Sequence, residues 1–343
     1  MVSLSLVTTE SKPPITDSLP KLVELVSQAK DVLIGTHLNP DGDAIGSALA
    51  VSLWLDKLGV RNEVICHNAL PGYLHFLPGH ERVTLRPTRT GHDLGMVLDL
   101  DSLDRLGSCK PYFEAVPHLI LIDHHQPHEM PGNLRIVDST APATAAILCD
   151  AFQNLLSTDP ALFGGSIGAD IAECLLTGLV TDTGSFRYPN TTAQSLHQAA
   201  WLVEQGANLF RVTDECYLNR DEQAVQLLRE ALNLMKSDCN GRLAWAVLPP
   251  ELYTKLGAQE EHTEGIVNEI LSARPVQAAF VLRAGKFGKV KGSLRSKGDL
   301  DVAKVAQQIG GGGHKNASGV TVEDSLEGAE ATVVQALKEA LGC

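Results

Sequence analysis

The sequence predicts an α/β protein of two domains, and three observations lead to this fold class. The chain has 343 residues, which is long for one domain and comfortable for two. In its first half, short apolar runs alternate with helical patterns, as in a parallel sheet with both faces covered. Near Ser237 the pattern changes to β-type runs broken by glycines, which predicts a second, smaller α/β domain.

Four short apolar runs bounded by turn residues predict the strands of the first domain. They lie at 31–37, 61–69, 95–101 and 118–125. A helical pattern at 44–59, closed by Gly59, separates the first two runs. The apolar run at 171–180 has no clear period, so it fits a helix or a strand.

Helical patterns follow at 191–206, which Gly206 would cap, and at 213–237. After them, β-type patterns lie at 241–249, 275–296 and 317–323, and helical patterns at 301–310 and 327–341. We therefore predict a first domain at 1–194, a helical linker at 195–235 and a second domain at 236–343.

Composition and charge exclude several classes of protein. Apolar residues make up 44% of the chain and charged residues 20%, which excludes disordered and fibrous proteins. The net charge of -13 repels nucleic acid at long range, so such a partner must be short, or held by a basic patch or a metal. Residues 283–315 hold eight Lys and Arg against two Asp, a net charge of +6. This stretch is either a solvated hairpin or an anion clamp.

Two further features predict a cytoplasmic protein. The seven cysteines are dispersed without a CxxC pair, which is typical of reduced thiols. The N-terminal segment has no basic region before an apolar stretch, and no stretch approaches the ~18 apolar residues that a membrane helix needs. We therefore expect no secretory signal and no membrane partner.

Acidic residues and histidines follow four of the apolar runs. They are His37, Asp41 and Asp43 after the first, Asp99 after the third, Asp123, His124 and His125 after the fourth, and Asp182 after 171–180. Each group alone is typical of a turn or a helix cap. Together they indicate one site, because ligands bind beyond the carboxyl ends of parallel strands. Several carboxylates with imidazoles suit two divalent cations, with Mn²⁺ the first candidate.

A second group of residues lies near the C-terminus. Gly310 to Gly313 are followed by His314 and Lys315, between a predicted helix and a predicted strand. Such a glycine loop lets backbone N–H groups approach an anion, and we favour this interpretation over a flexible linker. The order helix, loop, strand differs from that of a Walker phosphate loop.

Five motifs of the chain resemble those of the DHH-family phosphoesterases, in the same order and over about residues 20–340. The motifs are HLNPDGD at 37–43, DLDSLDR at 99–105, IDHH at 122–125, TDTGSFRYPNTT at 181–192 and GGGGHKNASG at 310–319. The glycine loop is similar to that of the DHH-associated domain in the exonuclease and nanoRNase branch. Asp101 stands where the family usually has a small residue.

The resemblance implies a role for each site residue. His37, Asp41 and Asp99 would hold one metal, and Asp43, Asp99, His124 and Asp182 the other, with Asp99 as the catalytic bridge. His125 would be the second catalytic residue, in contact with the scissile phosphate or the leaving group. Arg295, Gly311, Gly312, Gly313 and His314 would bind the terminal phosphate or nucleotide from the second domain. Arg105, Arg187 and Asn190 also match family positions, without an assigned role.

The implied activity is hydrolysis of short oligoribonucleotides, from dinucleotides to pentanucleotides, to mononucleotides. Cleavage of 3′-phosphoadenosine 5′-phosphate to AMP is expected with it. The resemblance also implies an active site in the cleft between the two domains and two divalent cations, Mn²⁺ ahead of Mg²⁺, Co²⁺ or Fe²⁺. The expected partners are short single-stranded RNA, dinucleotides and nucleotide phosphates, and a homodimer is left open.

The sequence also allows other functions of the same family. A phosphodiesterase of cyclic dinucleotides, or of their linear products, would use the same residues. A family pyrophosphatase would have the same metal ligands, but the sequence GGGGH argues against its different C-terminal domain. A catalytically inactive regulator would lack a ligand, and none is missing.

Overall fold

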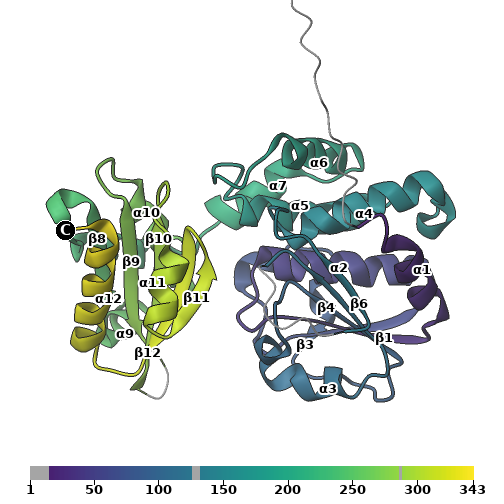
Figure 1. Cartoon of the computed structure of the whole chain (residues 1–343), viewed down its shortest axis with the longest axis horizontal. Helices are drawn as coiled ribbons and strands as arrows, with labels where there is room; N and C mark the ends of the chain where they lie inside the picture. Colours follow the sequence, from purple (N-terminus) through teal and green to yellow (C-terminus); the bar gives the residue numbers. More distant parts are fainter. Residues whose placement is uncertain (1–14, 126–131, 286–287) are drawn as a thin grey trace, which may run out of the picture. The chain divides into compact units, whose positions relative to one another are not determined.

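The computed structural model describes residues 15–125, 132–285 and 288–343, apart from the side chain of His314. The chain forms two compact units that divide between Asn219 and Arg220 (Figure 1). The division falls inside the stretch that we predicted as a helical linker. Each unit contains one six-stranded sheet.

The first unit is built on a parallel sheet, as the apolar runs predict. Its strands are β1 (Asp31–Thr36), β2 (Arg61–Ile65), β3 (Val83–Thr84), β4 (Leu94–Leu98), β5 (Leu119–Asp123) and β6 (Leu134–Val137). Their order is β3-β2-β1-β4-β5-β6, and every neighbouring pair is parallel. The chain leaves β1 toward one edge and returns to β4 on its other side, so the strand order reverses between β1 and β4. In parallel sheets a ligand site lies at the carboxyl ends of the strands at such a reversal.

Helices cover both faces of this sheet (Figure 1). The helices of this unit are α1 (Leu19–Gln28), α2 (Gly42–Lys57), α3 (Lys110–Glu114), α4 (Thr144–Thr158), α5 (Ala169–Asp182), α6 (Ala193–Glu204) and α7 (Leu209–Thr213). Short helical turns lie at Gly72–Leu74, His80–Arg82, Leu103–Cys109, Pro160–Phe163 and Asp214–Leu218. Side chains of α1, α2, α4 and α5 share one apolar core with the sheet, and Phe113 of α3 belongs to the core on the other face. The ambiguous run at 171–180 is thus part of a helix, α5.

Helices α2 and α5 pack closely because glycines lie at their contact. A Cβ at Gly46 would collide with the carbonyl oxygen of Cys174 in α5. A Cβ at Gly178 would lie 2.6 Å from Oδ1 of Asp43 in α2. The glycines therefore let the start of α2 and the end of α5 approach each other.

The second unit contains a mixed sheet with the order β11-β12-β10-β9-β8-β7. Its strands are β7 (Lys236–Asp238), β8 (Leu243–Leu248), β9 (Ala278–Ala284), β10 (Val290–Ser296), β11 (Gly311–His314) and β12 (Ala317–Val322). Its helices are α8 (Glu222–Asn233), α9 (Pro250–Leu256), α10 (Ile266–Ser272), α11 (Val302–Gln308) and α12 (Leu326–Leu341), with short turns at Cys239–Gly241 and Glu260–Thr263. Side chains of α8, α9 and α10 pack on one face of the sheet, and those of α11 and α12 on the other.

Two expectations for this unit are wrong. Residues 311–314 do not form a loop but the edge strand β11, which pairs in an antiparallel manner with β12 through the register Gly312↔Gly319. The cysteines are not all free thiols, because Cys239 and Cys343 form a disulfide bond. Neither error concerns the first unit. None of the helices in the described part of the chain has the length and apolar character needed to cross a bilayer.

The α2–α5 contact generates a prediction about stability. We expect Gly46→Ala to destabilise the first unit by about 1–2 kcal/mol, because overpacking against a backbone costs about 1–3 kcal/mol and alanine regains up to about 1 kcal/mol of helix propensity. A thermal unfolding curve should show a midpoint about 2–4 °C lower for each kcal/mol. The matched control is Gly72→Ala, an exposed glycine whose added Cβ would have no neighbour within 4 Å. An unchanged midpoint for Gly46→Ala would contradict the close packing.

Candidate metal centre

The carboxyl ends of β1, β4 and β5 meet the starts of α2 and α4 and the end of α5, and the predicted ligands gather there. His37 follows β1, Asp99 follows β4, and His124 and His125 follow β5. Asp41 and Asp43 lie at the start of α2, and Asp182 is the last residue of α5. All seven residues are thereby brought together. The sequence had left open whether the apolar run before Asp182 is a strand or a helix, and Asp182 reaches the site from the end of a helix.

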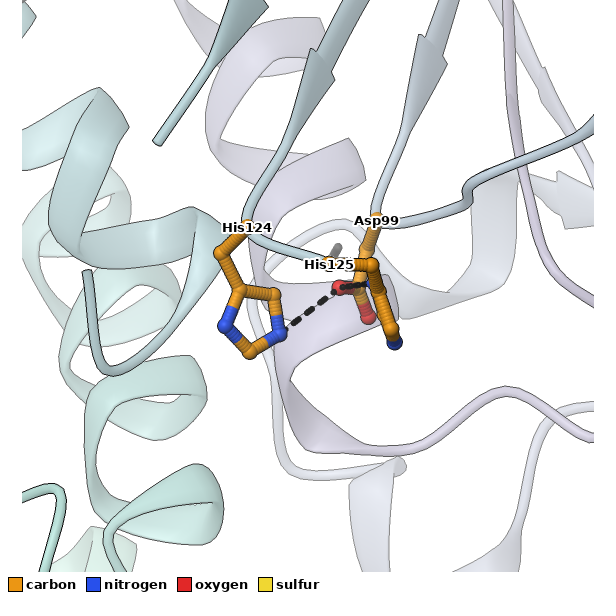
Figure 2. A group of neighbouring side chains, drawn as sticks. All are labelled: Asp99, His124 and His125. Carbon is orange, nitrogen blue, oxygen red and sulfur yellow. Dashed lines mark ion pairs between the residues drawn. The ribbon is translucent and has the colours of Figure 1, made fainter. Parts of the chain in front are cut away.

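Asp99 lies at the middle of the group. Its Oδ2 is 3.3 Å from Nε2 of His37, and its Oδ1 is 3.4 Å from Nε2 of His124. The same Oδ1 is 3.6 Å from Nδ1 of His125 (Figure 2). The two oxygens of one carboxylate therefore face imidazoles from different strands.

The backbone of Asp99 adopts an uncommon conformation. Its φ of 60° lies in the left-handed region, which costs a side chain other than glycine roughly 1–2 kcal/mol. Its N–H donates to the carbonyl oxygen of Ile122 in β5 at 3.0 Å, and the residue is only 2% exposed. Strain of this kind is typical of functional sites.

The described part of the chain contains three sets of residues that could each hold a metal ion. Within each set, the ligand atoms lie within 4.8 Å of one another. The sets are His37 with Asp41 and Asp99, Asp43 with His124 and Asp182, and Asp99 with His124 and His125. The first set has the same residues as the first ligand group that the resemblance implied, and the second set contains Asp43, His124 and Asp182 of the other group without Asp99. Each set offers the mixed carboxylate and imidazole donors that Mn²⁺ and similar cations accept.

Hydrogen bonds orient the histidines toward Asp99. Nδ1–H of His37 donates to the carbonyl oxygen of Leu38 at 2.9 Å, and Nδ1–H of His124 donates to that of Ala141 at 3.3 Å. A carbonyl only accepts, so these bonds require a proton on Nδ1, and Nε2 is the nitrogen that faces the carboxylates. His125 has the opposite orientation, because its Nδ1 is the nitrogen that faces Asp99, and this Nδ1 also lies 2.7 Å from Oδ1 of Asp123.

Two of the carboxylates also cap helices. Oδ1 of Asp41 accepts from the N–H groups of Asp43 and Ala44, each at 3.1 Å, and so caps α2. Helix α4 has Ala143 before its first residue and thus no side-chain cap of its own. Asp43 caps it instead, since its two oxygens accept from the N–H groups of Thr144 at 2.6 Å and Ala145 at 2.8 Å. The helix N-termini therefore hold both carboxylates in place.

Negative charge is in excess at this site. Burial and the charge of Asp99 raise the pKa of Asp43 to about 8. Burial and the charge of Asp43 raise the pKa of Asp182 well above its usual range. Burial would lower the pKa of His124, but the hydrogen bond with Asp99 and the charge of Asp182 raise it well above the usual value. A divalent cation supplies the missing positive charge, so the donor set fits a metal.

The site also contains one residue that sequence reasoning missed, Thr144, and one whose role it left open, Asp123. Thr144 is buried and contacts both Asp43 and Asp99, and Asp123 orients His125. Nothing in the local sequence marks Thr144, because its partners lie 101 and 45 positions away. Asp123 ends an apolar strand next to two histidines, which marked the segment but not the role of the carboxylate.

The predicted substrate-binding residues lie in the second unit. Arg295 is on β10, where its Nη1 donates to the carbonyl oxygen of Leu294 at 3.0 Å. Its Nε is buried and has no hydrogen-bond partner among the described residues. Gly311, Gly312 and Gly313 are on β11, and the side chain of His314 lies outside the described residues.

Two family models match the chain, and known proteins resemble it in sequence and in structure. Residues 31–179 match the N-terminal domain of the DHH family, and residues 240–342 match the DHHA1 domain. The chain is similar to the bifunctional oligoribonuclease and PAP phosphatase NrnA of Thermus thermophilus, with 32% identity over 90% of each chain. Among solved structures it resembles an exopolyphosphatase-related protein from Bacteroides fragilis, with 27% identity, a TM-score of 0.85 and coverage of 94% of this chain and 96% of that one. RecJ from T. thermophilus, solved in complex with Mn²⁺, shares the fold at 16% identity and a TM-score of 0.53, over 98% of this chain and 56% of that chain.

The position of Asp99 generates a prediction about metal binding. We expect Asp99→Asn to lower bound Mn²⁺ from about two ions per chain to one or none, because the carboxylate charge between the two groups is lost. Asparagine tolerates a positive φ, so the backbone should remain as it is. Elemental analysis after equilibration with Mn²⁺ measures the change.

The control is Asp101→Asn, which removes a nearby carboxylate that pairs with Arg105 at 3.9 Å and belongs to none of the three sets. This variant should bind as much Mn²⁺ as the wild type. Equal Mn²⁺ in the Asp99→Asn protein would exclude Asp99 as a shared ligand.

Proposed function

The chain belongs to the DHH family, and we propose that it is a metal-dependent phosphoesterase that hydrolyses short oligoribonucleotides to mononucleotides and 3′-phosphoadenosine 5′-phosphate to AMP. The observation that carries the proposal is the buried carboxylate of Asp99, with one oxygen facing His37 and the other facing His124. The relative at 32% identity, named for both activities, supports the choice of substrates.

The metal ligands in this proposal are the two groups that meet at Asp99. His37, Asp41 and Asp99 would hold one divalent cation. Asp43, His124 and Asp182 would hold the other, together with Asp99, whose Oδ1 lies 3.4 Å from Nε2 of His124. The mixed donors favour Mn²⁺, with Mg²⁺, Co²⁺ and Fe²⁺ as alternatives. When bound, the cations supply an activated water and neutralise charge on the phosphoryl oxygens.

The side chains around the metal ligands have separate tasks in the reaction. The Asp123 carboxylate holds the Nδ1 edge of the His125 ring, so we assign the opposite Nε2 edge to the scissile phosphate or its leaving oxygen. The helix caps keep Asp41 and Asp43 oriented before any substrate arrives. Such prior orientation avoids reorganisation during the reaction, which is a main source of catalytic rate.

In the second unit, Arg295, Gly311 to Gly313 and His314 would bind the terminal phosphate or nucleotide. The buried Nε of Arg295, unpaired among the described residues, supports this role because phosphate would give it an acceptor. The position of β11 at the end of the strand order gives further support, since an unpaired strand edge presents N–H groups. At Gly312 an added Cβ would have no neighbour within 4 Å, so the backbone is open to a ligand.

The proposed activity predicts a defined substrate pattern. Protein loaded with Mn²⁺ should convert 5′-phosphorylated dinucleotides to mononucleotides, and EDTA should abolish the activity until Mn²⁺ is restored. Chromatography of the products, with 3′-phosphoadenosine 5′-phosphate, cyclic dinucleotides and pyrophosphate in parallel, measures the preference. Rapid cleavage of cyclic dinucleotides or of pyrophosphate, with dinucleotides left intact, would replace the proposal by that alternative.

The proposed role of Arg295 predicts an effect on substrate binding. Arg295→Ala should raise KM for dinucleotides about tenfold or more, because short substrates have few other contacts, and should affect pentanucleotides less. Arg295→Lys should also be harmful, since lysine lacks the planar pair of donors. The control for steady-state kinetics is Lys255→Ala, which also removes one positive charge but from an exposed side chain on α9. Unchanged constants for both Arg295 variants would remove this residue from the substrate site.

A further inference from the structure

We propose that Thr144 is a positioning residue that fixes the Asp43 and Asp99 carboxylates relative to each other. It thereby determines how tightly the more weakly bound of the two cations is held. The inference rests on the proposed function, because it concerns the same metal site. It goes further by naming the group that decides which way the shared carboxylate faces.

Thr144 contacts the two carboxylates through different atoms. Its backbone N–H donates to Oδ2 of Asp43 at 2.6 Å, and its hydroxyl donates to Oδ1 of Asp99 at 3.1 Å. The residue is 0% exposed, so water does not compete for either bond. Both acceptors are carboxylates, which makes the two bonds stronger than bonds between neutral groups.

The hydroxyl determines the rotation of the Asp99 carboxylate. It bonds to Oδ1, the oxygen near His124, and this leaves Oδ2 facing His37. Without that bond, the carboxylate could turn and offer both oxygens to one cation. We infer that the Thr144 hydroxyl keeps one oxygen of Asp99 for each ligand group.

The start of α4 is anchored in the core of the first unit and can therefore act as a reference for the site. Ile147, Leu148, Ala151 and Phe152 of this helix are buried in the core of the first unit. A second tie lies nearby, because Nδ2 of Asn190 donates to the carbonyl oxygens of Pro142 at 3.3 Å and Asp182 at 3.0 Å. The helix N-terminus is therefore linked to Asp43 and Asp99 by Thr144 and to the end of α5 by Asn190.

Metal binding tests the role of the hydroxyl separately from that of the backbone. Thr144→Val keeps the shape and the N–H that caps onto Asp43, and removes only the hydroxyl. We expect the metal-free variant to bind the weaker of two Mn²⁺ ions about 10–100-fold less tightly in a calorimetric titration, as for other groups that orient metal ligands. Thr144→Ala should show the same loss, and Thr144→Ser, which keeps the hydroxyl, should bind Mn²⁺ as the wild type does.

The matched control is Thr177→Val. Thr177 is also 0% exposed, but its hydroxyl donates to the carbonyl oxygen of Glu173 within α5 at 2.8 Å. The Thr177→Val protein should therefore bind Mn²⁺ as the wild type does. Wild-type affinity in Thr144→Val and Thr144→Ala, or an equal loss in Thr144→Ser, would overturn the inference alone. A wild-type protein that binds no Mn²⁺ would overturn the proposed metal site and this inference with it.

Discussion

The structure depends on the burial of several carboxylates in one place. Asp43 and Asp99 are almost fully buried, and Asp182 lies with them around His124. Neighbouring carboxylates repel each other strongly where water is excluded. Each buried carboxylate therefore needs a positively charged group or a hydrogen-bond donor beside it. Helix N-termini, imidazoles and a threonine hydroxyl supply part of that compensation. We assign the rest to the cations of the proposed metal site, so this site and the fold around it depend on the same residues.

Sequence reasoning succeeded where the chemistry was local. The apolar runs before His37, Asp99 and His124 are strands whose side chains are buried on both faces, so their pattern was readable. The run before Asp182 was not readable, because residues from Ile171 to Val180 are buried on every side of α5. A helix buried all round loses the period that distinguishes it from a strand. The residue was therefore found, and the element that carries it was not.

The remaining errors have a different physical cause, because they concern groups without a local signal. Gly311, Gly312 and Gly313 have no side chains, so no alternation could mark β11 as a strand. The disulfide joins Cys239 to a residue 104 positions later, and Asp43 caps a helix that begins 101 positions later. Such pairs become visible only when the chain is folded.

The use of candidate metal ligands as helix caps links the site to the stability of the first unit. Asp41 caps α2 and Asp43 caps α4, so the same carboxylates hold two helices and face the candidate metal positions. A ligand that binds only the folded chain stabilises it in proportion to the logarithm of its concentration over Kd. In the proposed metal site, cations would relieve repulsion among Asp43, Asp99 and Asp182 and would thereby stabilise the helix starts as well as supply the chemistry of the reaction. In this arrangement the same hydrogen bonds orient Asp41 and Asp43 and stabilise the starts of α2 and α4, so a change that disturbs the site also destabilises these two helices.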